Sequence, residues 1–415
     1  MPPDIRPYRW PQALLALVAA ITLTALPQTA VPAAAVVVRQ EEWPLDAQHF
    51  DADSIWRLAQ GQGVTVAVID SGVDATHPDL AGQVLSGTGF IGDPKDTGQS
   101  DISSDSHGTA IAGIIAGTGT AQGGSGMIGL APRAKLLPVR VGAQGAVTAL
   151  ALAQGIKYAA DHHAQVINVS LGTPTPDPLL REAVAYALGK DAVLVASAGN
   201  SGQDGNPLLY PAAFPGVIDV TGTDAQGQFW PVSESGPHTT LAAPSTRIYS
   251  TNSHGQYVQA EGTSYGAAYV SAAAALVRST SPRLTASQTI RRLITTAQHP
   301  SGHALPDDQY GYGIVAPLAA LKDASTTASN TNPLLSAPIS AGQADAHSDT
   351  IVIVAAGGLA AATAVTSAFI WRRRARSRGN QRRAQPTTPQ HPPAKRKKNG
   401  RSNSSASHPT RSRSR

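Results

Sequence analysis

The chain has 415 residues, enough for one large domain or two ordinary ones, and its apolar content can supply a core. It contains no cysteine, which excludes disulfides, thiol nucleophiles and thiolate metal sites. The net charge is +5, but residues 372–415 hold 15 Lys and Arg and no acid, so residues 1–371 carry a net charge of −10. The basic charge is therefore confined to a tail and does not indicate a nucleic-acid-binding protein.

The chain begins with the features of a secretory signal peptide, which we assign to residues 1–35. The apolar run at residues 13–26 follows two arginines and is short for a transmembrane helix. Ala33-Ala34-Ala35 fits a cleavage site with small residues. An uncleaved signal anchor is the alternative. Residues 36–62 then form an N-terminal leader extension.

Residues 63–321 alternate short apolar runs with helical patterns, which predicts one α/β domain. Runs rich in β-branched residues predict buried strands at 64–69, 136–141, 166–169, 193–196 and 217–220. Helical patterns occupy 107–116, 147–160, 179–188, 264–278 and 286–296, the last with a capping box of Thr285 and Gln288. This alternation predicts a mostly parallel sheet between layers of helices.

Membrane and tail features follow the predicted domain. Residues 322–350 are rich in Ser, Thr, Ala and Asn and predict a flexible linker. Residues 351–371 carry no charge and end at Trp371, which predicts a transmembrane helix rather than a buried Ala-rich helix. The arginines that follow predict that residues 372–415 form a disordered cytoplasmic tail, with the domain outside the cell. Binding of the tail to anionic lipid or nucleic acid is the alternative, but we predict that it fixes topology and has no specific nucleic-acid partner.

Three motifs in the domain carry an acid, a base and a hydroxyl. Asp70 follows the first predicted strand, His107 opens the first predicted helix, and Ser264 begins the Ala-rich helix. Alone, each has a structural explanation: a turn aspartate, a packed histidine and an N-cap serine. Together, and in the chain order Asp, His, Ser, they predict a catalytic triad in which Asp70 orients His107 and His107 activates Ser264.

The segments around these residues resemble the subtilisin-like serine proteases, or subtilases. The likeness covers roughly residues 40–321 and is carried by Val64–Val73, His107–Gly117, Gly129–Pro132, Val166–Gly172, Ala198–Asn200 and Gly262–Ala267. Within that family the chain resembles the mycosins, proteases associated with type VII secretion in actinobacteria, through its Trp43-containing leader, the Tyr310–Gly313 segment, the linker and the C-terminal span. The resemblance implies the three-layer fold of subtilisin, protein or peptide substrates, and no cofactor.

The resemblance also implies roles for further residues. Asn200 matches the asparagine that donates to the oxyanion of the reaction intermediate. Ser170, Leu171 and Gly172 match the substrate-binding strand, and Ala198 and Gly199 line the same pocket from the other side. Gly145-Ala146 is a looser match for the opposite edge. Subtilases often bind calcium, but the acidic residues Asp93, Asp96, Asp101 and Asp105 lack a calcium-loop spacing, so we assign no metal site and interpret them as solvated charge.

The sequence departs from the family pattern in three places. Gly266 replaces an alanine and Ala268 replaces the proline four residues after Ser264, which predicts looser packing beneath the nucleophile and a lower turnover than in a typical subtilase. The absence of cysteine departs from many mycosins. The leader before Gly63 is too short for a folded inhibitory prodomain, so we predict that it wraps on the protease instead.

Two functions fit these observations. The first is a single-pass, membrane-anchored serine endopeptidase that hydrolyses exported proteins and is linked to a type VII secretion complex. The second is a weakly active or inactive protease domain that acts as a structural subunit of such a complex. The complete triad and Asn200 favour the first function, whereas the departures at Gly266 and Ala268 leave the second open. A nucleic-acid-binding function through the tail rests on charge alone.

Overall fold

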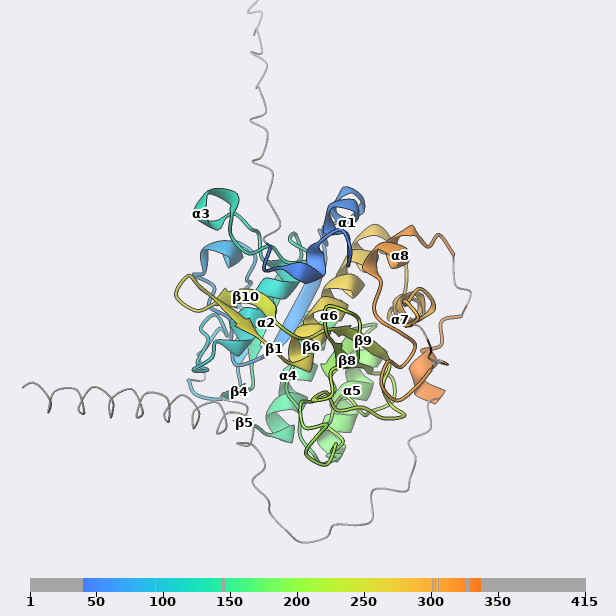
Figure 1. Cartoon of the computed structure of the whole chain (residues 1–415). Coiled ribbons are helices and arrows are strands. Elements are labelled where there is room, and N and C mark those ends of the chain that lie inside the picture. Colours follow the sequence, from blue (N-terminus) through green and yellow to red (C-terminus); the bar gives the residue numbers. More distant parts are fainter. Residues whose placement is uncertain are drawn as a thin grey trace, which may run out of the picture. The chain divides into compact units, whose positions relative to one another are not determined.

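A seven-stranded parallel sheet forms the centre of the structure, a computed structural model that describes residues 40–336 except 94, 144–145, 301, 303, 305 and 326–328. The strands lie in the order β2-β3-β1-β6-β7-β8-β9, and β1, β6, β8 and β9 of this sheet are labelled in Figure 1. Their bounds are β1 Thr65–Asp70, β2 Thr88–Gly89, β3 Lys135–Arg140, β6 Val166–Val169, β7 Val193–Ser197, β8 Ile218–Thr223 and β9 Leu241–Pro244. The five predicted strands are therefore all present in one parallel sheet.

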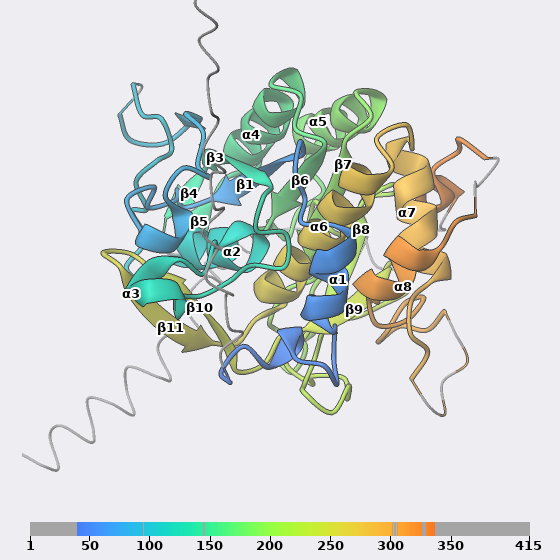
Figure 2. The same ribbon diagram turned by 90° about the horizontal axis from the view of Figure 1, so that it is seen from above.

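Helices cover both faces of the sheet, as the alternating pattern predicts. The helices α2 (His107–Ala116) and α6 (Thr263–Thr280) lie on one face, and α4 (Ala149–Asp161) and α5 (Pro178–Gly189) lie on the other (Figure 2). In β1, Val66 and Val68 join the core beneath α2 and α6, whereas Ala67 and Ile69 join the core beneath α4 and α5. Because both faces are buried, the strand is apolar throughout, and the expected three-layer α/β fold is confirmed.

Two hairpins and several short helices were not predicted from the pattern. Two antiparallel hairpins pair β4 (Gly142–Ala143) with β5 (Ala146–Val147) and β10 (Ile248–Asn252) with β11 (Gln256–Ala260). The short helices are η1 Trp43–Leu45, α1 Ala52–Leu58, η2 Pro78–Leu80, α3 Ala121–Gly124, α8 Pro317–Lys322 and η3 Pro333–Ser336. The predicted helix at 286–296 is α7, Ala286–Thr295, and it begins with the expected capping box of Thr285 and Gln288.

The described part of the leader packs against the domain. The indole N–H of Trp43 donates to the carbonyl of Thr246 at 3.1 Å, and that of Trp56 donates to the carbonyl of Leu130 at 3.0 Å. The buried carboxylate of Glu42 accepts from the backbone N–H of Ile128 at 2.8 Å. These contacts agree with a leader that wraps on the protease.

The predicted signal peptide (1–35), transmembrane helix (351–371) and basic tail (372–415) lie outside the described residues, as does most of the linker. Among the residues that the structure describes, no helix is long and apolar enough to cross a membrane.

Candidate active site

Asp70 and His107 meet where β1 ends and α2 begins. His107 Nδ1 lies 2.9 Å from Asp70 Oδ1 and 3.0 Å from Oδ2, and Asp70 is fully buried. The approach depends on Gly108, because a Cβ there would lie 2.1 Å from the carbonyl oxygen of Gly72 and 3.1 Å from Asp70 Cβ. A side chain at position 108 would thus push the start of α2, and His107 with it, away from the carboxylate.

The pKa of His107 reflects two opposing influences. Burial disfavours the protonated ring, but the charge and hydrogen bond of Asp70 favour it more strongly, with smaller contributions from the charges of Asp105 and Asp101. Together they raise the pKa of His107 from 6.5 to about 9. Because only the neutral ring can accept a proton, this shift favours proton transfer to His107 at higher pH.

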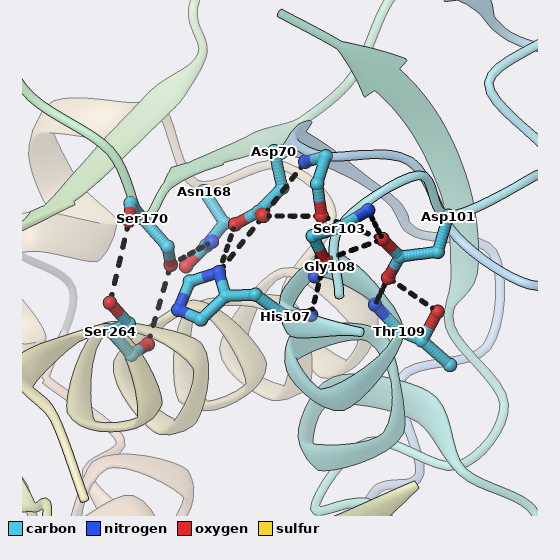
Figure 3. A network of polar contacts seen from close by, with 10 residues as sticks. Asp70, Asp101, Ser103, His107, Gly108, Thr109, Asn168, Ser170 and Ser264 are labelled. Atoms are coloured by element: carbon cyan, nitrogen blue, oxygen red, sulfur yellow. Dashed lines mark hydrogen bonds and ion pairs between the residues drawn. The ribbon is translucent and has the colours of Figure 1, made fainter. Parts of the chain in front are cut away.

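Ser264 lies in the first turn of α6, on the far side of the His107 ring from Asp70 (Figure 3). Ser264 is 6 % exposed, and its hydroxyl donates to the carbonyl of Ser170 at 3.4 Å. No hydrogen bond joins it to His107 within the described structure. Catalytic hydrogen bonds are often long in empty sites and shorten when substrate binds, so this geometry leaves the predicted triad possible.

Ser170 is itself held in place from β6 and α6. Its hydroxyl accepts from Asn168 Nδ2 at 2.8 Å and donates to the backbone carbonyl of Ser264 at 3.3 Å (Figure 3). Asn168 is buried and accepts in turn from the hydroxyl of Ser271 at 3.0 Å. These bonds fix the strand end that carries Ser170 against the helix that carries Ser264.

Asn200 lies beside Ser264 with its amide orientation set by Thr263. Asn200 Oδ1 accepts from the backbone N–H of Thr263 at 2.9 Å and from its hydroxyl at 3.1 Å. Because a backbone N–H can only donate, the oxygen of the amide must face Thr263. Among the described residues, no hydrogen bond occupies the Asn200 NH2 group, which is therefore available as a donor.

The predicted substrate-binding residues lie on two neighbouring segments. Leu171 and Gly172 are partly exposed beyond β6, whereas Ala198 and Gly199 are at the end of β7, the strand that pairs with β6. Gly145 lies outside the described residues, and Ala146 belongs to the β4–β5 hairpin. A Cβ on Gly142 of that hairpin would lie 3.1 Å from Leu171 Cδ1, so the hairpin borders the same strand end.

Comparisons with known proteins show the family of this chain. Residues 61–313 match the family described as Peptidase_S8, the subtilase family. The chain belongs to the subtilase family. It is 38 % identical over 233 residues to thermitase of Thermoactinomyces vulgaris, which covers 56 % of this chain and 81 % of thermitase. As a member of this family, the protein is a serine endopeptidase.

Two solved structures of MycP proteases are similar to this chain in fold and sequence. The crystal structure of MycP1 with its N-terminal propeptide removed aligns with a TM-score of 0.60 and 34 % identity, over 69 % of this chain and 99 % of that one. The MycP3 protease from the type VII (ESX-3) secretion system aligns with a TM-score of 0.57 and 34 % identity, over 70 % of this chain and 90 % of that one.

The subtilase packs tightly around the two positions that depart from the family pattern. A Cβ on Gly266 would lie 2.7 Å from Ser245 Oγ and 3.4 Å from Ala243 Cβ, and Ala268 is fully buried. The expected looseness beneath Ser264 is therefore not what the packing shows. Glycine at 266 instead lets α6 lie closer to β9 and Ser245 than an alanine would allow.

The interpretation of the acidic loop before His107 as solvated charge is wrong for Asp96 and Asp101. Asp93 and Asp105 are exposed, but Asp96 forms an ion pair with Arg140, and Asp101 accepts hydrogen bonds from three neighbouring residues. Arg140 lies 44 residues after Asp96 along the chain. Of the partners of Asp101, Ser71 lies 30 residues before it, and Ser103 and Thr109 lie 2 and 8 residues after it. Local sequence pattern carries no sign of such contacts.

A second group of buried acids lies on β8 and the loop after it, and sequence reasoning missed it. Asp219 is fully buried, Glu234 is 2 % exposed, and His238 Nε2 lies 3.4 Å from Asp219 Oδ2. Burial and the nearby Glu234 raise the pKa of Asp219 well above its usual range, and burial raises that of Glu234 to about 8. An Asp between Ile218 and Val220 in an apolar strand was the available signal.

Glu234 borders the turn that carries Asn200. Its Oε1 accepts from the backbone N–H of Ser201 at 3.2 Å, and a Cβ on Gly199 would lie 2.3 Å from its Oε2. Among the described residues, no group of three or more His, Asp or Glu side chains is placed to hold a metal ion.

Proposed function

We propose that Asp70, His107 and Ser264 form the catalytic triad of this serine endopeptidase. The Asp70–His107 contact, at 2.9 and 3.0 Å with Ser264 across the ring, is the observation that carries the proposal (Figure 3). His107 Nε2 takes the proton of the Ser264 hydroxyl as its oxygen attacks a peptide carbonyl, and Asp70 stabilises the imidazolium that results. His107 then protonates the leaving amine, and water releases the acyl group by the reverse steps.

Asn200 and the substrate strands complete the proposed site. The Asn200 NH2 group and the backbone N–H of Ser264 stabilise the oxyanion, since Thr263 holds the amide oxygen away from it. A substrate in an extended conformation pairs with the edges at Ser170–Gly172 and Ala198–Gly199. The shared position of these edges, at the ends of the paired strands β6 and β7, supports this assignment.

The proposed setting is the outer face of a cell membrane. A signal peptide at 1–35 and a transmembrane helix at 351–371 would anchor the domain there, with the basic tail inside. The likeness to the MycP3 protease of a type VII secretion system, at 34 % identity over 70 % of this chain, supports a link to such a complex and to exported protein substrates.

A structural subunit of a secretion complex is the second candidate. It is favoured by one observation: the Ser264 hydroxyl donates to Ser170 rather than to His107. An inactive domain would keep this arrangement when substrate binds, whereas an active protease would turn the hydroxyl toward the ring.

Labelling with a fluorophosphonate, which reacts only with activated serines, separates the two candidates. The folded protein and its Ser264→Ala variant are labelled side by side, with Ser279→Ala as a control on the same helix, because among the described residues the Ser279 hydroxyl bonds only the Leu276 carbonyl of that helix. Labelling that disappears only in Ser264→Ala supports the protease. A folded protein that resists labelling supports the structural subunit.

A further inference from the structure

The helix that carries His107 has no cap of its own. The residue before it, Ser106, is in the left-handed region at φ 54°, and its side chain makes no capping hydrogen bond. The first intrahelical bond runs from Ala110 N–H to the carbonyl of Ser106 at 2.9 Å. The backbone N–H groups of residues 107–109 therefore need acceptors from elsewhere, because the first turn of a helix leaves them unpaired.

Three side chains from outside the helix supply these acceptors. Ser103 Oγ accepts from His107 N–H at 3.0 Å, and Ser71 Oγ accepts from Gly108 N–H at 3.0 Å. Asp101 Oδ2 accepts from Thr109 N–H at 2.8 Å. The start of α2 is thus fixed by the loop before it and by the end of β1.

Asp101 is the common acceptor of this arrangement (Figure 3). Its Oδ1 accepts from Ser71 Oγ at 2.9 Å, and from the Oγ and backbone N–H of Ser103 at 2.8 and 3.0 Å. Its Oδ2 also accepts from Thr109 Oγ1 at 2.7 Å. One carboxylate therefore contacts both serines that accept from the first two N–H groups of the helix.

The direction of each hydroxyl proton follows from this geometry. A hydroxyl has one proton, so a serine that donates to Asp101 presents its lone pairs to the backbone N–H behind it. Ser103 uses its proton in this way and accepts from His107. Ser71 lies 2.9 Å from Asp101 Oδ1 and 3.2 Å from Asp70 Oδ1, so its single proton faces a carboxylate in either case.

We infer that Asp101 is a positioning residue that holds the start of α2, and thereby His107, against Asp70. The inference rests on the proposed triad and goes beyond it, because Asp101 touches no reacting atom. An ionised carboxylate offers acceptor sites only, which all of these donors require, and its charge also suits the positive end of a helix. An amide in its place presents one NH2 group to donors and disrupts the arrangement.

Asp105 provides a matched control in the same loop. It is exposed, and its charge, like that of Asp101, raises the pKa of His107. Asp101→Asn and Asp105→Asn therefore remove the same kind of charge near the ring, but only the first removes the common acceptor. When the rates of the two variants are compared at about pH 10, above the pKa of His107, a change in that pKa has little effect. A difference in rate then reports a change in the position of His107.

The experiment uses the full chain in detergent and a peptide substrate, with rates divided by the number of sites that a fluorophosphonate labels to completion. We expect Asp101→Asn to lower kcat per labelled site about 10- to 100-fold with KM changed less than about threefold, the size of effect that small displacements of a catalytic group produce. Asp105→Asn should keep kcat within about threefold, since its carboxylate bonds nothing at the helix start. The acid limb of the pH profile should move to lower pH in both variants.

Equal kcat per labelled site in the two variants overturns the inference while the proposed triad stands. A wild-type chain that neither labels nor cleaves overturns the proposed function instead. A purely structural role would lower the melting temperature and the number of labelled sites but not kcat per site, and this result also overturns the inference.

If Asp101→Asn does not fold, Ser103→Ala serves in its place. It removes the acceptor of His107 N–H and keeps the Asp101 bonds to Ser71 and Thr109. We expect a loss of about three- to tenfold in kcat per labelled site, because one of the three acceptors is gone. An unchanged value overturns the inference.

Discussion

Two buried aspartates each lie beside a histidine, Asp70 beside His107 and Asp219 beside His238, yet their surroundings differ. Asp70 accepts from the Ser71 N–H at 2.8 Å as well as from His107 at 2.9 Å. Asp219 lies 3.4 Å from His238, and neither of its carboxylate oxygens has a hydrogen-bond partner among the described residues. The pKa of His107 is raised to about 9, whereas burial lowers that of His238 against the opposing charge of Asp308.

The comparison indicates that the donors around the carboxylate, rather than burial alone, decide whether the pKa of the neighbouring histidine is raised or lowered. A buried carboxylate keeps its charge when donors replace the lost water, and otherwise it binds a proton. Burial and the second acid, Glu234, raise the pKa of Asp219, and the backbone N–H of Val220 offsets them only in part. Burial lowers the pKa of His238, so the shifts of both groups favour their neutral forms, although their 3.4 Å separation is that of an ion pair.

Equivalent substitutions in the two pairs should have unequal effects. Asp70→Asn is expected to lower kcat about 10⁴-fold, because an amide stabilises the wrong tautomer of His107. Asp219→Asn is expected to keep kcat within about threefold, because burial and Glu234 raise the pKa of its carboxyl toward the neutral form and no described contact joins it to the proposed triad. Steady-state rates per labelled site measure both. A loss of similar size in Asp219→Asn would break the comparison.

The pH dependence of activity should follow His107. The raised pKa predicts that kcat/KM increases about tenfold per pH unit below about pH 9, since only the neutral ring accepts the Ser264 proton. The same shift also stabilises the folded state. This contribution is fully present below the unfolded-state pKa of 6.5 and is lost as the pH rises through about 9. Activity and melting temperature measured over this range should thus change in opposite directions. A kcat/KM that is already constant above pH 7 would contradict the ionic Asp70–His107 pair.

The raised pKa of Glu234 should make the folded state less stable as the pH rises, whereas a paired carboxylate makes it more stable. The unfolded chain ionises it above 4.5 and the folded chain only near 8, so its contribution to stability falls as the pH rises from 4.5 to 8. Glu234→Gln removes this loss, and we expect it to be more stable than the wild type by about 1–3 kcal/mol at about pH 9 and equal at about pH 4. Denaturation at both pH values tests this, with the exposed Glu261→Gln as the control. A variant that is less stable at both values would show that the carboxylate is stabilising.

The packing of α6 against β9 and Ser245 gives the smallest expected effect. Gly266→Ala gains helix propensity of about 1 kcal/mol but places a methyl group 2.7 Å from Ser245 Oγ, and we expect a net loss of about 1–2 kcal/mol. Ser245→Ala in the same chain should restore most of it. Gly189→Ala, in α5 with nothing within 4 Å of the added Cβ, is the control and should be neutral or stabilising. A stable Gly266→Ala single variant would mean that Ser245 moves aside at little cost.

The elements with strong local signals were predictable. The helix at 107–116 has the same bounds in the structure, and the runs at 64–69 and 166–169 lie within one residue of β1 and β6. Their periodicity and β-branched composition follow directly from burial on one or both faces. β9, Leu241–Pro244, gave no such signal because it is short, rich in alanine and without a β-branched residue.

The residues of the proposed triad were singled out from local motifs, because each stands at the end of a strand or the start of a helix. The bonds that position them were not, since Asp101 acts through Ser71, 30 residues before it. The burial of Glu234 beside Gly199 depends likewise on how the loop after β8 folds back. Such contacts are fixed by tertiary packing, to which a single sequence gives no direct access.

The leader has a consequence for the order of folding. The Trp43 indole finds its acceptor, the carbonyl of Thr246, 203 residues further along the chain. Leu45 and Ile55 of the same segment are buried in the core beneath α2 and α6. The first part of the domain to leave the ribosome is therefore among the last to reach its native contacts, since the residues that cover it are made later. Until then its apolar side chains stay exposed, and a chain without cysteine has no disulfide to hold the segment in place.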